Sequence, residues 1–124
     1  MDWAGAKITS VSASHFPETD LAVIRRWCDR QSAKLPADEL RIAHVVGARS
    51  VDVGEERPPW RGDTDDAWTF MAVARLTYVK SRNQWSLGVS DSNGDFHRYT
   101  PMPTGTLASL LDEIDADPMC AFWG

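Results

Sequence analysis

The middle of the chain constrains the fold most, because its large apolar residues stand at alternating positions rather than at helical spacing. Strands are expected over residues 40–46, 51–55, 68–79, 85–89 and 96–99. Several of them are joined by short polar turns, including Asn93-Gly94, which tolerates the positive φ angles of hairpin turns. Short turns join antiparallel neighbours, whereas parallel strands need much longer crossover connections. The alternation therefore predicts a five-stranded antiparallel meander.

One helix is expected before the strands and one after them. The first is capped by Thr19 or Asp20 and ends near Ala33. Its apolar residues recur at helical spacing: Leu21, Ile24, Trp27 and Cys28. The second is capped by Thr104 or Thr106. Its apolar stripe consists of Leu107, Leu110, Leu111 and Ile114.

These elements define the expected fold class and domain organisation. Each helix has one apolar stripe and can therefore cover part of one sheet face. The chain is predicted to be α+β, with an N-terminal helix, a five-stranded antiparallel β-meander and a C-terminal helix packed on one sheet face. Residues 17–124 are predicted to form a single domain and residues 1–16 a flexible N-terminal arm. The second sheet face is left to solvent, to the loop and tail, or to a partner.

Composition and charge exclude several classes of protein. A chain of 124 residues is long enough to bury a core without metals or disulfides. The net charge of −5 argues against a general nucleic-acid binder. No stretch approaches the roughly 18 apolar residues of a membrane span, and no leader pattern is visible, so the chain is expected to be cytoplasmic and reduced. Cys28 is expected to be a small buried hydrophobe, and a disulfide to Cys120 stays open.

The segment Glu55-Glu56-Arg57-Pro58-Pro59-Trp60 carries two carboxylates, a guanidinium and an indole at the exit of the second strand. Charged groups beside a stiff, aromatic loop form either a structural clamp or a functional site. The strand alternation places Glu55 on the apolar side with His44, and Glu56 on the other side. Glu55 is therefore the candidate for a buried role, and Glu56 is expected to hold the loop or its arginines.

The register of the first hairpin decides what His44 and Glu55 can do. If Val46 pairs with Val51, His44 becomes a diagonal neighbour of Glu55 on the apolar face. Polar groups on such a face need partners. The two residues then form an acid–base or ligand-binding pair with perturbed pKa values, or they form a hydrogen-bonded structural pair or lie at a wet end of the face. The structural interpretation is favoured.

The last hairpin adds Asp91, His97 and Tyr99, and its register stays open. A three-residue loop with a bulged glycine puts Val89 opposite His97, beside the apolar side chains of the fourth strand. A two-residue turn at Asn93-Gly94 shifts the register by one and moves His97 to the other face.

Two functions are compatible with these residues, and the favoured one is a non-enzymatic ligand- or protein-binding module. Its surface would be rich in arginine and tryptophan and would surround the segment 55–60. The predicted contact residues are Glu56, Arg57, Trp60, Arg75, Trp85 and Tyr99. For the arginines alone, the simpler interpretation is that Arg57 and Arg75 pair with carboxylates of residues 55–56 or of the acidic last helix.

The second function is a small metal-assisted hydrolase or nuclease. Its catalytic residues would be His44, Glu55, Asp91 and His97, whose N and O atoms suit a divalent metal. No HxH, HxxxH or HExxH spacing supports a metal site, and no GxSxG, Walker or GxGxxG motif is present. No cofactor follows from the sequence. The enzyme needs at least three of these side chains around one cavity, whereas the binding module needs an exposed patch with Trp60 and Trp85 at its rim.

Several motifs occur in a fixed order along the chain. They are the segment 55–60, a strand opening at Trp68, Trp85 with Asp91-x-Asn93 and His97-x-Tyr99, Leu110-Leu111-x-Glu113-Ile114-Asp115-x-Asp117-Pro118, and Phe122-Trp123-Gly124. Together, over residues 18–124, they resemble the bacterial family called domain of unknown function 3024. The resemblance implies a small stand-alone domain and carries no activity.

One expectation follows from the resemblance, and two more follow from the residues and the sheet. Gly54 stands where an aromatic or aliphatic residue is expected from the family, which indicates a bulge or a close ligand approach. The terminal aromatic residues Phe122 and Trp123 are expected to dock onto the domain. Partners are expected to be a small ligand, a protein or a second copy of the chain, because a sheet covered on one face leaves edges and surface to hide.

Overall fold

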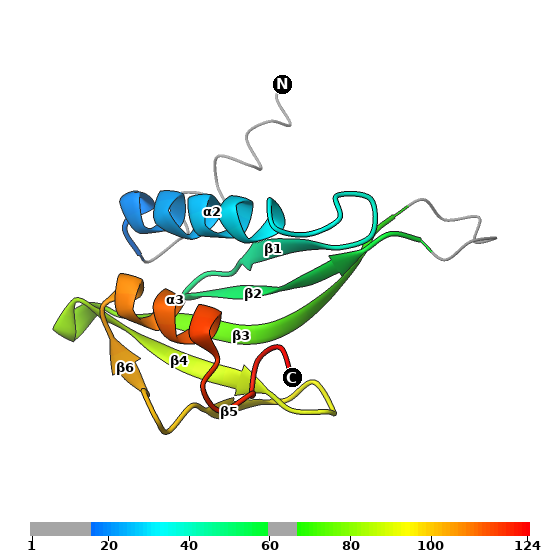
Figure 1. Ribbon diagram of the computed structural model, residues 1–124. Helices are drawn as coiled ribbons and strands as arrows, with labels where there is room; N and C mark the ends of the chain where they lie inside the picture. The colour runs from blue at the N-terminus through cyan, green and yellow to red at the C-terminus, as the bar shows by residue number, and fades with distance from the viewer. Residues whose placement is uncertain (1–15, 60–66) are drawn as a thin grey trace.

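The computed structural model describes residues 16–59 and 67–124, which fold into two helices and an antiparallel sheet (Figure 1). The helices are α2 (Glu18–Ser32) and α3 (Leu107–Ala116). The strands are β1 (Arg41–Val46), β2 (Ser50–Arg57), β3 (Thr69–Val79), β4 (Gln84–Ser90), β5 (Phe96–Arg98) and β6 (Thr104–Gly105). A short 3₁₀ helix, η1 (Lys80–Arg82), joins β3 to β4. The α+β fold class is confirmed, and neither described helix is long and apolar enough to cross a membrane.

The strands follow one another in the order β1-β2-β3-β4-β5, and each pair is antiparallel. The meander predicted from the alternation is therefore confirmed. The sequence missed β6, which pairs with β4 beside β5 and places Thr104 opposite Ser86. Two residues are too few to show an alternating pattern, so only the pairing in space identifies this strand.

Both open questions of register are answered by the strand pairing. Val46 lies opposite Val51 in the first hairpin, as the sequence suggested. In the last hairpin Val89 lies opposite His97, which is the register of the three-residue loop. Gly94 has a φ of 84°, and this left-handed conformation suits a residue without a Cβ.

Gly54 marks a β-bulge between β2 and β3. Val53 lies opposite Ala74, but Gly54 lies opposite Ala72, so Val73 is an extra residue on β3. A Cβ atom at Gly54 would stand only 2.1 Å from the carbonyl oxygen of Met71. The close neighbour of this glycine is therefore the backbone of β3. Of the two explanations offered for Gly54, a bulge or a close ligand approach, the structure shows the bulge.

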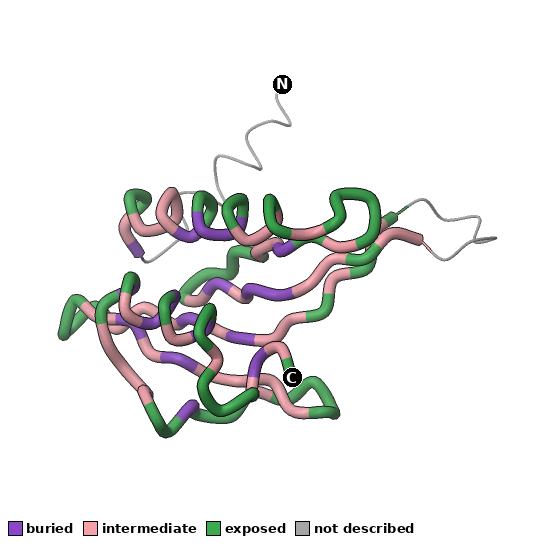
Figure 2. Tube along the Cα trace, in the orientation of Figure 1, coloured by how far each residue is buried: buried purple, intermediate pink, exposed green. Residues whose placement is uncertain are grey.

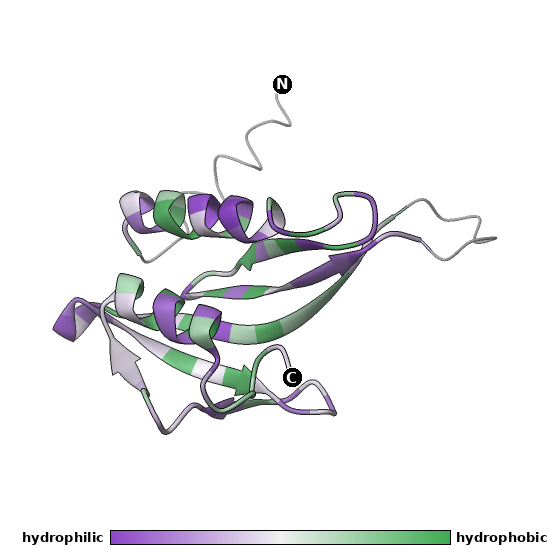
Figure 3. Ribbon diagram, in the orientation of Figure 1, coloured by the Kyte–Doolittle hydropathy of each residue, from purple (hydrophilic) through white to green (hydrophobic). Residues whose placement is uncertain are grey.

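The core lies between the two helices and one face of the sheet. The strands contribute buried residues at alternating positions, such as Val51, Val53, Leu76 and Leu87. The helices contribute their apolar stripes, including Ile24, Trp27, Leu110 and Ile114. Figure 2 shows the buried segments on the strands and on the helix sides, and Figure 3 shows how apolar and polar residues interleave along the same elements. We call the opposite side of the sheet the helix-free face.

The start of the domain is held by contacts to Trp85. The helix begins at Glu18 and Pro17 provides no side-chain cap, so the prediction of Thr19 or Asp20 as cap is wrong. The Asp20 carboxylate instead accepts a hydrogen bond of 2.8 Å from the Trp85 indole. Phe16, assigned to the arm from the sequence, is buried with its ring centroid 5.5 Å from that of Trp85. The remainder of the predicted arm, residues 1–15, lies outside the described residues.

The C-terminal segment is docked on the domain, as predicted. Asp117 ends α3 in the left-handed conformation, with a φ of 44°. Its carboxylate accepts hydrogen bonds from the backbone N–H groups of Ala121, Phe122 and Trp123. The Trp123 indole donates to the carbonyl of Ile114, and Phe122 is buried against the Tyr99 ring. One carboxylate thus fixes the path of the last residues.

Two further predictions concern the cap of α3 and the two cysteines. Thr106 caps α3 by accepting a hydrogen bond from the Ser109 N–H, which selects it over Thr104. Both cysteines are free thiols, so the open question of a disulfide is answered. Cys28 is buried as expected, and burial raises its pKa to about 12, with a smaller contribution from the charge of Asp29. Cys120 is exposed.

Candidate functional site

The helix-free face carries a row of residues that crosses four strands. Asp52 lies opposite Arg75, Arg75 opposite Gly88, and Gly88 opposite Arg98. Directly paired residues of antiparallel strands project from the same face of a sheet. Their chain neighbours Val51 and Leu76 are fully buried on the helix side, so this row lies on the other side.

Arg75 is held in one position at the centre of this face. Its Nε and Nη2 atoms donate to the two carboxylate oxygens of Asp52 at 2.7 and 3.0 Å. Its guanidinium carbon stands 4.1 Å from the centroid of the Phe96 ring. The hydrogen bonds to Asp52 raise the pKa of Arg75. The sequence expected an acidic partner for Arg75 but named the wrong ones, since Asp52 was not considered.

A second cation–aromatic pair lies near the segment 55–60. The Arg41 Nε atom stands 2.6 Å from the Glu56 carboxylate, and the Arg41 guanidinium carbon lies 3.8 Å from the Trp68 ring centroid. Glu56 thus holds Arg41 of β1, whereas the sequence expected it to hold the loop or the arginines of the loop. The exposed Arg57 side chain pairs with Glu55 at 3.1 Å. This agrees with the simpler interpretation, in which Arg57 pairs with a carboxylate of residues 55–56. Trp60, a predicted contact residue, lies outside the described residues, as does Arg61.

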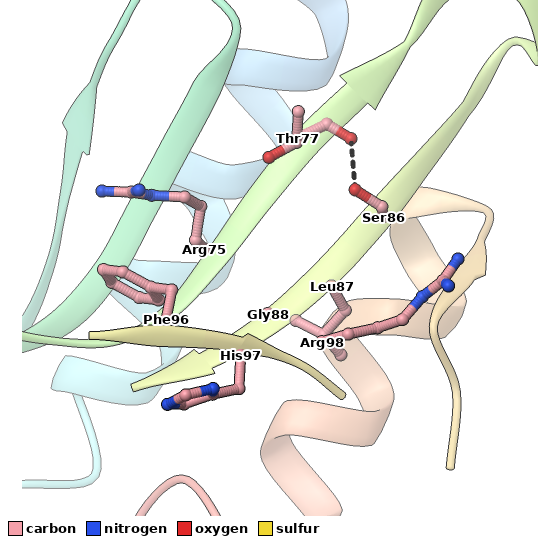
Figure 4. Close-up of a pocket in the computed structure, with 8 residues that line it drawn as sticks. All are labelled: Arg75, Thr77, Ser86, Leu87, Gly88, Phe96, His97 and Arg98. Carbon is pink, nitrogen blue, oxygen red and sulfur yellow. Dashed lines mark hydrogen bonds between the residues drawn. The ribbon is translucent and has the colours of Figure 1, made fainter. Parts of the chain in front are cut away.

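A shallow depression of about 290 Å³ lies on the helix-free face (Figure 4). It is lined by Arg75, Thr77, Ser86, Leu87, Gly88, Phe96, His97 and Arg98. In Figure 4, Arg75 and Phe96 lie on one side of Gly88, Arg98 extends on the side of Ser86, and the His97 ring points away from these groups. In the part of the chain that the structure describes, no carboxylate lies within ion-pair distance of Arg98.

Two predicted contact residues belong to the core instead. Trp85 is only 2% exposed, and its indole is bound to Asp20. Tyr99 is only 3% exposed, and its hydroxyl donates to Glu113 at 2.7 Å. Burial, with help from the Glu113 carboxylate, raises the pKa of Tyr99 to about 12. Neither ring is available to a partner, so their prediction as surface residues is wrong.

The candidate catalytic residues are distributed over different parts of the molecule. The His97 Nε2 atom stands 2.6 Å from Asp91, and this contact, with backbone N–H groups of Asp95 and Asn93, lowers the pKa of Asp91. Asp91 and Glu55 line one cavity of about 700 Å³, between the bulge on β3, the β4–β5 turn and the C-terminal segment. Each of the two carboxylates already has an ion-pair partner, Asp91 with His97 and Glu55 with Arg57.

His44 lies apart from the other three. It lines a different cavity of about 510 Å³, together with Cys28, Ser32 and Ile42. Burial lowers the pKa of His44, and the charge of Arg25 lowers it further. Among the residues that the structure describes, no hydrogen bond joins His44 to Glu55, and no three His, Cys, Asp or Glu side chains are grouped to hold a metal ion.

The geometry defines the class of protein: an α+β domain in which two helices cover one face of an antiparallel meander and leave the other face open. The model of the family described as "Domain of unknown function (DUF3024)" matches residues 13–124. The chain therefore belongs to this family. No curated protein and no solved structure matches it.

The motif residues that carry the resemblance have mostly structural contacts. Partly buried hydrogen bonds of these residues connect different elements of the fold. The residues are Trp85, Tyr99, Glu113, Asp117 and Trp123. They join α2, α3, the sheet and the C-terminal segment. The sequence did not single out Asp52, Gly88 or Phe96. The strand alternation placed Asp52 and Gly88 away from the apolar face, and it placed Phe96 there only in the register of the three-residue loop.

Proposed function

We propose that the domain is a non-enzymatic binding module and that its contact surface is the helix-free face together with the segment 55–60. The observation that carries the proposal is the placement of Arg75 and Arg41 on this face. Each guanidinium lies over an aromatic ring and is fixed by a carboxylate, at Asp52 and Glu56 respectively. Both helices pack on the other side of the sheet, where the buried residues of the core lie.

Fixed arginines beside aromatic rings are well suited to recognition. Arginine and aromatic residues dominate the binding energy of known interfaces. A side chain that is already held in place loses less conformational entropy when a partner binds. Ordinary solvent-exposed ion pairs contribute little to stability, so stability alone does not account for two such arrangements on one face. The partner would be a small ligand or a protein, and a second copy of the chain is one such protein.

The alternative, a metal-assisted hydrolase or nuclease, has less support. It needs three catalytic side chains around one cavity. Glu55 and Asp91 share a cavity and His97 contacts Asp91, but each carboxylate already has a partner. His44 lines another cavity. We therefore place the binding module first.

A ligand screen with matched variants tests the proposal. The purified protein is screened by thermal shift against a library of small metabolites, and its mass in solution is measured by analytical ultracentrifugation. We expect ligand-induced stabilisation, or dimer formation, that is lost in the double variant Arg41→Ala/Arg75→Ala. Arg26→Ala on the exposed side of α2 is the control and should behave as the unmodified protein. If binding or dimerisation survives in the double variant, the proposal is wrong.

A further inference from the structure

We propose that the depression around Gly88 binds a small organic oxyanion. In this inference, which rests on the proposed function of the helix-free face, Arg98 binds the carboxylate or phosphate group of the ligand. The flat or apolar body of the ligand lies over Gly88, against the Phe96 ring and the aliphatic part of Arg75. These four residues all line the depression, which has a volume of about 290 Å³.

The strand register provides the floor of the site. Gly88 stands between Arg75 on β3 and Arg98 on β5, directly opposite both. Neighbouring strands lie about 4.8 Å apart, so the two arginine backbones are roughly 10 Å apart across the glycine. Because glycine has no side chain, the surface of the sheet is recessed at Gly88, between the long side chains of Arg75 and Arg98. A ligand can reach the backbone of β4 there.

The charges make Arg98 the group that would bind the anion. Arg75 donates two hydrogen bonds to Asp52, which neutralises its charge and fixes its position. Within residues 16–59 and 67–124, no carboxylate pairs with Arg98, and the side chain is exposed. An arginine without a partner binds carboxylate and phosphate groups through two parallel hydrogen bonds. Charge complementarity therefore selects an anion at the Arg98 end of the depression.

The remaining lining selects the rest of the ligand. Among the described residues, the Ser86 hydroxyl makes a single, long hydrogen bond of 3.4 Å to the carbonyl of Thr77, so it can turn toward an oxyanion at low cost. Figure 4 places Ser86 on the same side of Gly88 as Arg98, and Phe96 on the opposite side. The polar and aromatic groups are thus separated, which suits a molecule with one anionic end. The volume is at the lower end of the range for ligand pockets, which are about 300–1,000 Å³, so the ligand is small.

The closing experiment is a chemical-shift titration of the full chain with three probes of similar size. The probes are benzoate, phenyl phosphate and the neutral benzyl alcohol. We expect benzoate or phenyl phosphate to shift the backbone amide signals of residues 75, 88 and 98, while benzyl alcohol binds at least about tenfold more weakly. Preference for one acid over the other tells carboxylate from phosphate chemistry, and either result supports the site.

Three variants separate this site from general binding to a cationic surface. Arg98→Gln should weaken binding of the acid by about tenfold or more, because the charge-assisted hydrogen bonds are lost. Gly88→Ala should weaken it because the new Cβ, 3.3 Å from the His97 carbonyl oxygen, raises the floor without blocking the strand. Arg26→Gln, on the opposite side of the molecule, is the control and should bind as the unmodified chain does.

Three results would overturn the inference, and they bear differently on the proposed function. Shifts on the helix-free face that persist in both Arg98→Gln and Gly88→Ala would disprove this site while leaving the binding module in place. Acid-induced shifts confined to α2, or none at all, would also disprove it. The proposed function fails only when the metabolite screen and the measurement of mass likewise give no binding that depends on Arg41 and Arg75.

Discussion

Leu76 and Thr77 are neighbours on β3, but they belong to opposite faces of the sheet. Leu76 is completely buried beneath the helices, whereas Thr77 lies beside the depression on the helix-free face. The covered face is apolar and closely packed, and its few polar groups are joined by hydrogen bonds between elements. The helix-free face carries arginines, hydroxyl groups and half-buried aromatic rings. The comparison suggests that one face maintains the fold and that the other can vary without unfolding the domain.

The largest effect is expected from a direct comparison of these two neighbours. Leu76→Ala should lower the free energy of unfolding by about 2–5 kcal/mol, because it leaves a cavity in a packed core. Thr77→Ala should change it by less than about 0.5 kcal/mol. Urea unfolding at constant m-value measures both changes. Equal losses in the two variants would show that the helix-free face is also part of the folded core.

The two glycines of the sheet provide the next comparison. Gly54→Ala should destabilise the domain by about 3 kcal/mol, because its Cβ would stand 2.1 Å from a carbonyl oxygen of β3 and force the bulge to open. Gly88→Ala meets its nearest neighbour at 3.3 Å and should cost less than about 1 kcal/mol. Urea unfolding again measures both. A stable Gly54→Ala variant would mean that the close approach of β3 is not required.

The elements of the fold could be predicted because their signals are local. Helical spacing and alternation are properties of a few consecutive residues, and the turn at Asn93-Gly94 has its own chemistry. The partners of distant strands could not be predicted in the same way. Asp52 faces Arg75 only because β2 and β3 pair across the segment 58–68 in one particular register, which no local pattern specifies.

The error on the candidate site has a different cause. Trp85 was assigned to the surface because its indole resembled a binding group, yet it alternates with Leu87 and so shares the apolar face. Tyr99 lies opposite Leu87, through the hydrogen bond from its N–H to the Leu87 carbonyl. The alternation thus already indicated that Trp85 is buried, whereas for Tyr99 it did so only in the register of the three-residue loop, one of the two that the sequence left open. In that register Phe96 and Arg98 of β5 are the residues that the alternation assigns to the helix-free face.

A smaller effect is expected at the C-terminal segment, which belongs to the covered side. Asp117→Asn keeps the size of the side chain but replaces one of two accepting oxygens, so at least one of three N–H groups loses its partner. We expect a loss of about 2 kcal/mol, the range of a hydrogen bond to a charged group. Asp115→Asn, at an exposed position of the same helix, is the control and should be nearly neutral. Faster amide exchange at residues 121–123 in the Asp117 variant alone would locate the effect.

The smallest effect concerns a single hydroxyl on the covered side and its dependence on pH. Tyr99→Phe removes the hydrogen bond to Glu113 and should cost about 1 kcal/mol at neutral pH. Because burial raises the pKa of Tyr99 from 10.0 to about 12, the unfolded chain releases this proton first as the pH rises. The stability that Tyr99 contributes should therefore be complete below pH 10 and should fall between pH 10 and 12.

The difference in urea midpoint between the unmodified chain and Tyr99→Phe isolates this dependence from other groups that titrate in alkali. The chain has two tyrosines, so in Tyr78→Phe the absorbance of tyrosinate reports Tyr99 alone. We expect its midpoint well above 10, followed by loss of the fold. A midpoint near 10 with the fold intact would mean that the hydroxyl reaches water, and that the covered face is open where Tyr99 meets Glu113 of α3.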